Sequence, residues 1–291
     1  MASSNMQDIK RRKKSIRGIE HVTNAMKLVS AAKLRRAKAT FERTTKNFNF
    51  IIESIESVFS NATEIPEKYL SGHRDISKAC YIVMTSNRGL CGSFNSNVIK
   101  ETEKEIAATA GSRERPDIVA VGSKGRDFYL KRGYKICREY VTAPEQITFL
   151  EARELSRPVI SMYNEGEVDE VKLIYTSFIS TLEQRVKCVT LLPFKPGEPS
   201  EMEHGKREME YEPSVEEVFN YLVQKYVEIQ VYGAIIESAT CEHAARRMAM
   251  ENATDNAREM LEDLTLFYNR ARQAAITKEI IEIVAGSEAQ K

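Results

Sequence analysis

The sequence predicts an α/β protein in which a mainly parallel sheet domain is inserted between two long terminal helices. Three observations carry this prediction. All eight prolines and ten of the thirteen glycines lie between Pro66 and Pro213, strand-like and helix-like segments alternate inside that stretch, and apolar residues recur at helical spacing on both sides of it. Because proline breaks a helix interior and glycine weakens it by about 1 kcal/mol, the two flanks are predicted to be uninterrupted helices.

The chain is therefore expected to divide into an N-terminal helix at residues 1–62, a globular domain at 75–195 and a C-terminal helix at 210–291. The first helix is predicted to run from about Asp8 to Phe59. One face is marked by Leu34, Phe41, Phe48, Ile52, Ile55 and Phe59, and a weaker stripe among basic residues precedes it, made of Ile9, Ile16, Ile19, Met26 and Val29.

Inside the middle segment, the pattern predicts strands at 79–84, 117–121, 134–140, 170–179 and 185–192, with helices at 93–110, 124–132 and 145–163. Alternation of strands and helices favours a mainly parallel sheet covered by helices. The last two strands alternate in polarity and are separated by a short polar turn, which predicts a hairpin at the edge of the sheet.

The C-terminal helix is predicted to run from Ser214 to Ala285, and Ser214 followed by Glu217 has the spacing of a capping box. Its apolar residues recur in alternating steps of four and three, which is the seam of a coiled coil: Val215, Phe219, Leu222, Tyr226, Ile229, Gly233, Ile236 and Thr240. Small residues then continue the seam at Ala239, Ala244, Ala245, Ala249, Ala253 and Ala257.

Each terminal helix is apolar along one stripe only, so the two are expected to pack against each other as an antiparallel pair. A helical hairpin within a larger bundle is the alternative. The pairing leaves a C-terminal group of apolar residues for a partner, namely Ile276, Ile280, Ile283 and Val284.

Two glycine-containing loops, at 88–93 and 122–125, invite a nucleotide-site interpretation. Neither has the GxxxxGK[ST] or GxGxxG spacing that places backbone donors around a phosphate, so tight turns explain these glycines better. The four histidines lie in unrelated contexts, Cys91 has no identifiable base, and HExxH and GxSxG are absent. We therefore expect no catalytic site, no cofactor and no metal.

Charge is unevenly distributed in a chain whose formal net charge is only +1. The first forty residues hold eleven Lys or Arg against two acids, Asp8 and Glu20. Such a run is a solvated helix face, a nucleic-acid arm or a surface for an acidic protein partner. The five scattered cysteines form no CxxC pair, which indicates a reduced, cytosolic setting, and no apolar run is long enough to predict a membrane span or signal peptide.

Three motifs resemble one known family. SNRGLCGSFN at 86–95 looks like the first-strand loop of the gamma subunit of F-type ATP synthases, and VTNAMKLVSAAKL at 22–34 is similar to that family's N-terminal helix motif. The strongest match lies at 237–285 and includes EHAAR at 242–246, MAM at 248–250, NATDNA at 252–257 and YNRARQAAIT at 268–277. The motifs keep the family's order over nearly the whole chain.

The resemblance implies a Rossmann-like domain between the helices of an antiparallel coiled coil, and the role of a central rotor shaft that transmits torque. It implies as partners the alpha and beta subunits of the catalytic ring, the epsilon subunit and the membrane c-ring. It also implies a bacterial protein at the cytoplasmic face of the cell membrane, peripheral and attached only through partners, with no nucleic acid bound.

Six residues match family positions that contact partners or bear on coupling: Met26, Lys27, Arg246, Arg272, Gln273 and Thr277. Asn24 and Lys27 stand where the family commonly has Lys and Glu, so the local charge is rearranged there. The regulatory cysteine pair of the plant chloroplast form has no counterpart between Cys188 and Cys241.

Two other classes of function remain open from the residues. One is a coiled-coil adaptor that binds nucleic acid through its basic helix, although no aromatic residues are interleaved with the basic ones before Phe41. The other is a nucleotide-binding α/β enzyme with helical extensions. Co-purification with alpha and beta subunits, with nucleic acid, or with neither distinguishes the three.

Overall fold

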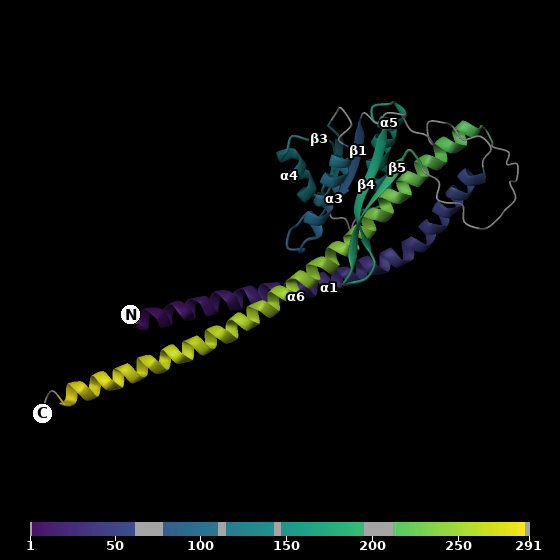
Figure 1. Cartoon of the computed structure of the whole chain (residues 1–291). Coiled ribbons are helices and arrows are strands. Elements are labelled where there is room, and N and C mark those ends of the chain that lie inside the picture. The colour runs from purple at the N-terminus through teal and green to yellow at the C-terminus, as the bar shows by residue number, and fades with distance from the viewer. Residues whose placement is uncertain are drawn as a thin grey trace. The chain divides into compact units, whose positions relative to one another are not determined.

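The computed structural model describes residues 2–61, 78–109, 115–142, 147–194, 212 and 214–288. Two long helices enclose an alternating α/β segment in chain order (Figure 1). The elements are α1 (Ala2–Asn61), β1 (Ala79–Met84), α3 (Phe94–Ala108), β2 (Asp117–Val121), α4 (Ser123–Lys131), β3 (Lys135–Tyr140), α5 (Phe149–Asn164), β4 (Glu170–Phe178), β5 (Gln184–Leu192) and α6 (Val215–Glu288).

The five strands form one sheet in the order β3-β2-β1-β4-β5. β1 pairs in parallel with β2 and with β4, and β2 pairs in parallel with β3. β5 runs antiparallel to β4 at the edge. The predicted mainly parallel sheet and its edge hairpin are therefore confirmed.

The two terminal helices are as long as the absence of proline predicts. α1 spans 60 residues and α6 spans 74, which correspond to about 90 Å and 110 Å at 1.5 Å per residue. The N–H of Glu217 donates to Ser214 Oγ at 3.3 Å, so Ser214 caps the start of α6 as expected.

Helix α5 departs from the proline rule used to predict the long helices. It contains Pro158 in its interior, and its start is fixed by a capping box in which Thr148 and Glu151 exchange hydrogen bonds. The first residues of the predicted helix at 145–163 lie partly outside the described residues, and the observed helix begins at Phe149.

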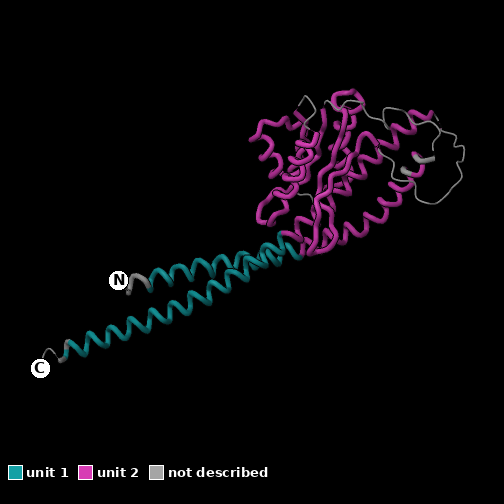
Figure 2. Tube along the Cα trace, viewed as in Figure 1, with its two compact units in different colours: residues 1–31, 246–291 teal, residues 32–245 magenta. Residues whose placement is uncertain are grey.

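The chain packs as two compact units, coloured separately in Figure 2. Unit 1 comprises Met1–Ala31 and Arg246–Lys291, and unit 2 comprises Ala32–Ala245. Each unit thus contains part of α1 and part of α6, whereas the whole sheet belongs to unit 2.

In unit 2 the sheet is buried on both faces, because successive side chains of a strand point to opposite sides. Tyr81 and Val83 of β1 pack with α3 and α4 residues such as Val98 and Tyr129. On the other face lies a larger core built from β1, β2, β4, α5, α1 and α6: among its members are Ile82, Met84, Val119, Leu173, Val159, Phe59, Phe219 and Val227. The long helices therefore serve as a covering layer of the sheet as well as a helical pair.

Candidate coupling surface

In unit 1, α1 and α6 run antiparallel and touch through polar groups. Thr254 Oγ1 donates to Thr23 Oγ1 at 2.9 Å, and Arg258 Nε lies 3.4 Å from Glu20 Oε1. Further along, Lys13 Nζ lies 5.6 Å from the centre of the Tyr268 ring, a cation–π contact. Residue numbers rise on one helix as they fall on the other, so the predicted antiparallel pairing is confirmed within this unit.

The weaker apolar stripe predicted on α1 is only partly correct. Ile9 and Ile16 are half-buried, but Ile19, Met26 and Val29 are 51%, 39% and 58% exposed. The seam is continued by residues in steps of three and four from Leu34 toward the N-terminus, and most of these are polar: Ser30, Lys27, Thr23, Glu20 and Lys13. Helical phase thus places mainly hydroxyl and charged side chains at the seam, with Ile16 among them, and turns Ile19, Met26 and Val29 outward.

Outward-facing apolar side chains on α1 form a surface of their own. Val22 is exposed on the same helix face as Ile19, Met26 and Val29, because the four follow steps of three and four, whereas Leu28 is exposed on another face. Exposed large apolar residues grouped on a helix are typical of protein contact sites. The end of α6 has the same character, since Ile276, Ile280, Ile281, Ile283 and Val284 are all between 47% and 72% exposed.

A basic groove of about 670 Å³ lies beside Tyr268 in unit 1. It is lined by Gln7, Lys10, Arg11, Lys13, Lys14, Arg17 and Tyr268. Of these cations, Arg11 lies 3.4 Å from Asp8 on the same helix. Concentrated positive charge around an aromatic ring suits acidic side chains of a partner, because opposite charges attract over several ångströms without interlocking.

The six residues singled out by resemblance occupy two places on the helices. Met26 is exposed and Lys27 half-buried, side by side on α1. On α6, Arg246 is half-buried, whereas Arg272, Gln273 and Thr277 are exposed.

Spacing along α6 separates Arg246 from the other group. Arg246 precedes Arg272 by 26 residues, about 39 Å along one helix. Gln273 and Thr277 lie one turn apart, and the Thr277 hydroxyl donates to the carbonyl of Gln273 at 2.9 Å. Gln273 and Thr277 therefore share one helix face as expected.

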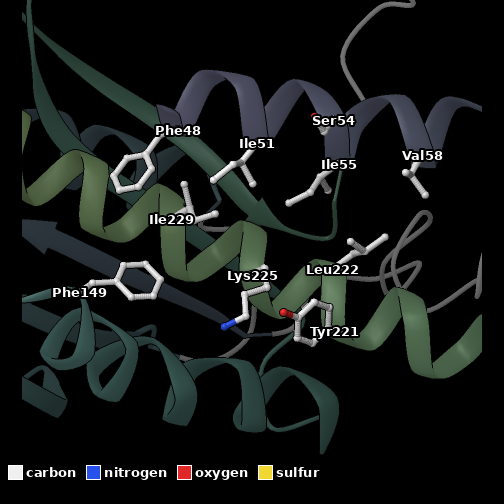
Figure 3. Close-up of a pocket in the computed structure, with 10 residues that line it drawn as sticks. All are labelled: Phe48, Ile51, Ser54, Ile55, Val58, Phe149, Tyr221, Leu222, Lys225 and Ile229. Atoms are coloured by element: carbon white, nitrogen blue, oxygen red, sulfur yellow. The ribbon is translucent and has the colours of Figure 1, made fainter. Parts of the chain in front are cut away.

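In unit 2 an apolar groove of about 560 Å³ is lined by residues of α1, α5 and α6 (Figure 3). Phe48, Ile51 and Phe149 line it, with Lys225 and Tyr221 at its polar part. The Lys225 ammonium lies 2.9 Å from a Glu228 carboxylate oxygen, so its charge is already compensated. The groove can hold apolar side chains and is not an anion site.

The segments that follow β1 and β2 are joined by hydrogen bonds. At the start of α4, the N–H of Ser123 donates to Asn87 Oδ1 at 2.9 Å, and the N–H of Gly125 to Thr85 Oγ1 at 2.8 Å. The N–H of Lys124 donates to the carbonyl of Ser86 at 3.1 Å. These are the helix N-terminal donors that a phosphate would need.

Gly122 explains why the second loop requires glycine. Its φ is 93°, and a Cβ there would collide with the carbonyl of Thr85. The positive φ and the close approach of the Thr85 backbone, and not a phosphate site, therefore account for this glycine.

Three of the cysteines, Cys91, Cys188 and Cys241, have the environment of structural thiols. Cys91 is buried and accepts a hydrogen bond from Asn95 Nδ2 at 3.2 Å. Burial raises the pKa of Cys188 to about 12 and also raises the pKa of Cys241, which disfavours the nucleophilic thiolate. Within the described residues, no cluster of His, Cys, Asp or Glu has the geometry to hold a metal ion.

Sequence reasoning missed the groups that join distant segments: Glu20 with Arg258, Thr23 with Thr254, and Glu237 with the end of β4. None lies in a motif with recognisable spacing, because the partners are far apart in the sequence. None of the described helices combines the length and apolar character of a membrane span.

Unit 1 is a helical pair with exposed apolar and basic surfaces, and unit 2 is an α/β domain covered by the same two helices, features typical of a protein that works by binding partners. Residues 5–290 match the family model described as ATP synthase. The chain is 44% identical over 290 residues to the ATP synthase gamma chain of Alkaliphilus metalliredigens, covering 98% of this chain and 99% of the relative. It is 40% identical over 304 residues to the sodium ion specific ATP synthase gamma chain of Acetobacterium woodii, covering 99% of each.

Solved structures show the same fold. A chain of the Euglena gracilis mitochondrial ATP synthase, in its OSCP/F1/c-ring structure, has a TM-score of 0.68 and 20% identity, covering 99% of this chain and 95% of that chain. A chain of the Tetrahymena thermophila central stalk and c-ring structure has a TM-score of 0.58 and 24% identity, covering 80% and 99%.

The chain therefore belongs to the family of ATP synthase gamma chains. Its role is that of the central rotor shaft of an F-type ATP synthase.

Proposed function

We propose that unit 1 is the part of the shaft that acts on the catalytic ring of alpha and beta subunits, and that unit 2 meets the epsilon subunit and the c-ring. The single observation that supports the first assignment is the surface of unit 1. Large apolar side chains, such as Met26 at 39% exposure and Ile283 at 72%, face outward, while the hydroxyls of Thr23 and Thr254 are hydrogen-bonded between the two helices. Unit 1 thus presents its contact residues to partners.

A pair of helices differs in chemistry around its axis, whereas a ring of like subunits is close to symmetric. On this surface, basic residues such as Lys10 and Arg17 line one groove and apolar residues such as Val22 lie elsewhere. Each catalytic subunit then contacts a different side of the shaft and is biased toward a different conformation. Rotation changes which conformation each subunit prefers, a population shift driven by differences in contact energy.

We assign partner contact and coupling to Met26, Lys27, Arg246, Arg272, Gln273 and Thr277. The exposure of Met26, Arg272, Gln273 and Thr277 supports this assignment. Lys27 and Arg246 are half-buried, so they act at the margin of the contact surface.

The chain performs no chemistry of its own in this proposal. The donors at the start of α4 are taken by Thr85, Ser86 and Asn87, which leaves no phosphate cradle at that loop. ATP hydrolysis or synthesis belongs to the partner subunits. Calorimetry with the whole chain and ATP checks this; micromolar affinity would contradict it.

We further propose that the protein lies at the cytoplasmic face of a bacterial cell membrane and is attached there only through its partners. Its bacterial relatives at 38–44% identity support this location. Fractionation of cells is the check: the chain should leave the membrane with the catalytic ring when partner contacts are broken, without detergent.

The contact role is tested with a double substitution, Gln273→Ala with Thr277→Ala, in the assembled complex. Alanine preserves the helix, and each lost polar contact to the ring costs about 0.5–1.5 kcal/mol. We expect reduced ATPase turnover with unchanged assembly. Glu217→Ala, at an exposed position of the same helix in unit 2, is the matched control. Full ATPase turnover and full coupling in the double variant would show that neither residue takes part in coupling.

A further inference from the structure

The carboxyl ends of β1 and β4 meet at the point where the strand order reverses, because the chain continues from β1 to β2 on one side and places β4 on the other. In open α/β sheets this crevice is where ligands bind. Here it is filled by the protein itself. Cys91 and Phe94 from the β1–α3 loop and α3 pack there with Cys241 of α6, together with Phe178 of β4.

Side chains from one stretch of α6 bind the last residues of β4. The Glu237 carboxylate oxygen Oε1 accepts the Ser177 hydroxyl at 2.7 Å and the N–H of Phe178 at 2.7 Å. Ser238 Oγ accepts the N–H of Thr176 at 3.2 Å. Three successive residues of the strand are therefore held by two adjacent residues of the helix.

A third link strengthens the attachment on the next turn. Cys241 Sγ donates to the carbonyl of Thr176 at 3.4 Å. Thr176, Ser177, Ser238 and Cys241 are all buried, so water does not compete for these hydrogen bonds. Short bonds to a carboxylate are also stronger than bonds between neutral groups.

The strand end is held by α1 as well. Phe41 packs edge-on against Phe178, with ring centres 6.0 Å apart. β4 itself is an inner strand, hydrogen-bonded to β1 and β5. A force applied to the sheet thus reaches both long helices through the last residues of β4.

We infer that Glu237 and the end of β4 form a stiff joint that transmits torque between the α/β domain and the shaft helices, with Glu237 as its positioning residue. The inference rests on the proposed function of the chain as a shaft. The joint lies at the crevice where other α/β proteins bind ligands, and here that place holds a mechanical connection. The half-buried Glu237 carboxylate accepts two hydrogen bonds at once, from the Ser177 hydroxyl and the Phe178 N–H. The shorter side chains of serine and alanine would not reach these donors.

The test compares Glu237→Ala with Glu237→Gln in the complete ATP synthase complex. Glutamine keeps an oxygen at the same place and preserves the two hydrogen bonds, whereas alanine removes both. Glu217→Ala serves as the control for loss of a glutamate from α6. Three quantities are measured: ATP hydrolysis, ATP-driven membrane potential followed with a voltage-sensitive dye, and hydrogen exchange at the Phe178 amide.

We expect Glu237→Ala to hydrolyse ATP but to build a smaller membrane potential per ATP hydrolysed. The loss should be largest when the complex pumps against a membrane potential that is already high. Its Phe178 amide should exchange at least about tenfold faster, the loss expected for one charge-assisted hydrogen bond. Glu217→Ala should behave like the wild type, and Glu237→Gln, which keeps both hydrogen bonds but loses their charge assistance, should show a clearly smaller deficit than Glu237→Ala. A role confined to fold stability would instead lower assembly and hydrolysis together.

Normal pumping per ATP by Glu237→Ala against a high membrane potential would contradict the inference of a joint. If that variant does not assemble, Ser177→Ala is used, because it removes only one of the hydrogen bonds. It should show a smaller reduction in membrane potential per ATP, and normal pumping by Ser177→Ala would also contradict the inference. Failure of the proposed function is distinguishable, because the wild-type chain would then neither assemble with nor stimulate a catalytic ring.

Discussion

The same two helices pair in both units, but the chemistry between them differs. In unit 2, Phe48 of α1 meets Tyr232 of α6 with ring centres 5.6 Å apart, and Phe59 meets Phe219 at 4.7 Å. In unit 1 the corresponding contacts are a pair of threonine hydroxyls, an ion pair and a cation–π contact. In one unit the helical pair thus has an aromatic, hydrophobic core, and in the other it has polar contacts beside small or single apolar residues such as Ala257 and Met250.

The difference indicates which unit is stable by itself. Buried aromatic side chains supply the largest gains in hydrophobic free energy, and paired rings add about 0.5–1.5 kcal/mol. The ion pair between Glu20 and Arg258 is partly solvated, since the Arg258 side chain is 51% exposed, and such pairs contribute about 1 kcal/mol or less. We therefore expect unit 2 to carry most of the stability of the fold and unit 1 to depend more on contacts with partners.

Hydrogen exchange on the isolated chain should show the largest contrast. Residues 219–235 of α6 contribute many members of the buried core, so their amides should open only with global unfolding, at about 5 kcal/mol or more. Residues 270–285 are mostly exposed and should exchange with little protection. Strong protection of 270–285 without partners would contradict the comparison.

Phe59→Ala should cause the largest loss of stability of any single change at the helix pair. Phe59 is 1% exposed and contacts Phe194 and Phe219, so its truncation should cost about 3–5 kcal/mol of unfolding free energy, measured by chemical denaturation. Phe50→Ala is the matched control on the same helix, because Phe50 is 71% exposed. Equal effects of the two would mean that burial in unit 2 does not decide stability.

In unit 1, a double-mutant cycle on Glu20→Ala and Arg258→Ala should give a coupling energy much smaller than the loss of stability expected for Phe59→Ala. The coupling energy is expected at about 1 kcal/mol or less, and it should fall further as salt is added. Unfolding in urea at low and high ionic strength measures it. A coupling of several kcal/mol that ignores salt would place a strong structural contact where we describe a weak one.

Exposed polar contacts should count for least even in unit 2. The backbone N–H and hydroxyl of Thr148 lower the pKa of Glu151 below its ordinary value. Its contribution is therefore present above the unfolded pKa and is lost as pH falls through the folded pKa. Between pH 7 and pH 3 the wild type should lose slightly more stability than Glu151→Ala; an identical pH dependence would show that the capping box contributes nothing.

Most of the fold was predictable from the sequence, because proline and glycine positions mark the helices and apolar runs mark the buried strands. The seam of unit 1 was not, since an apolar stripe was assumed to face the partner helix. Ile19, Met26 and Val29 instead face outward, and Thr23 and Glu20 face α6. Apolar pattern identifies a seam only where the apolar residues serve the fold and not a partner.

The joint at Glu237 was beyond sequence reasoning for a different reason. Its partners Ser177 and Phe178 lie about sixty residues away, and only the packing of α6 over the sheet brings them within 2.7 Å. Exposure of Arg272, Gln273 and Thr277, by contrast, follows from helical periodicity once the seam is known.

On this account the chain turns as the rotor while its partners carry out the chemistry. The most direct test attaches a bead through Lys131→Cys, an exposed site at the end of α4, in a complex whose catalytic ring is fixed to a surface. The account predicts that the bead rotates in one direction during ATP hydrolysis and stops when ATP is removed. Hydrolysis at the normal rate while a firmly attached bead stays still would contradict it.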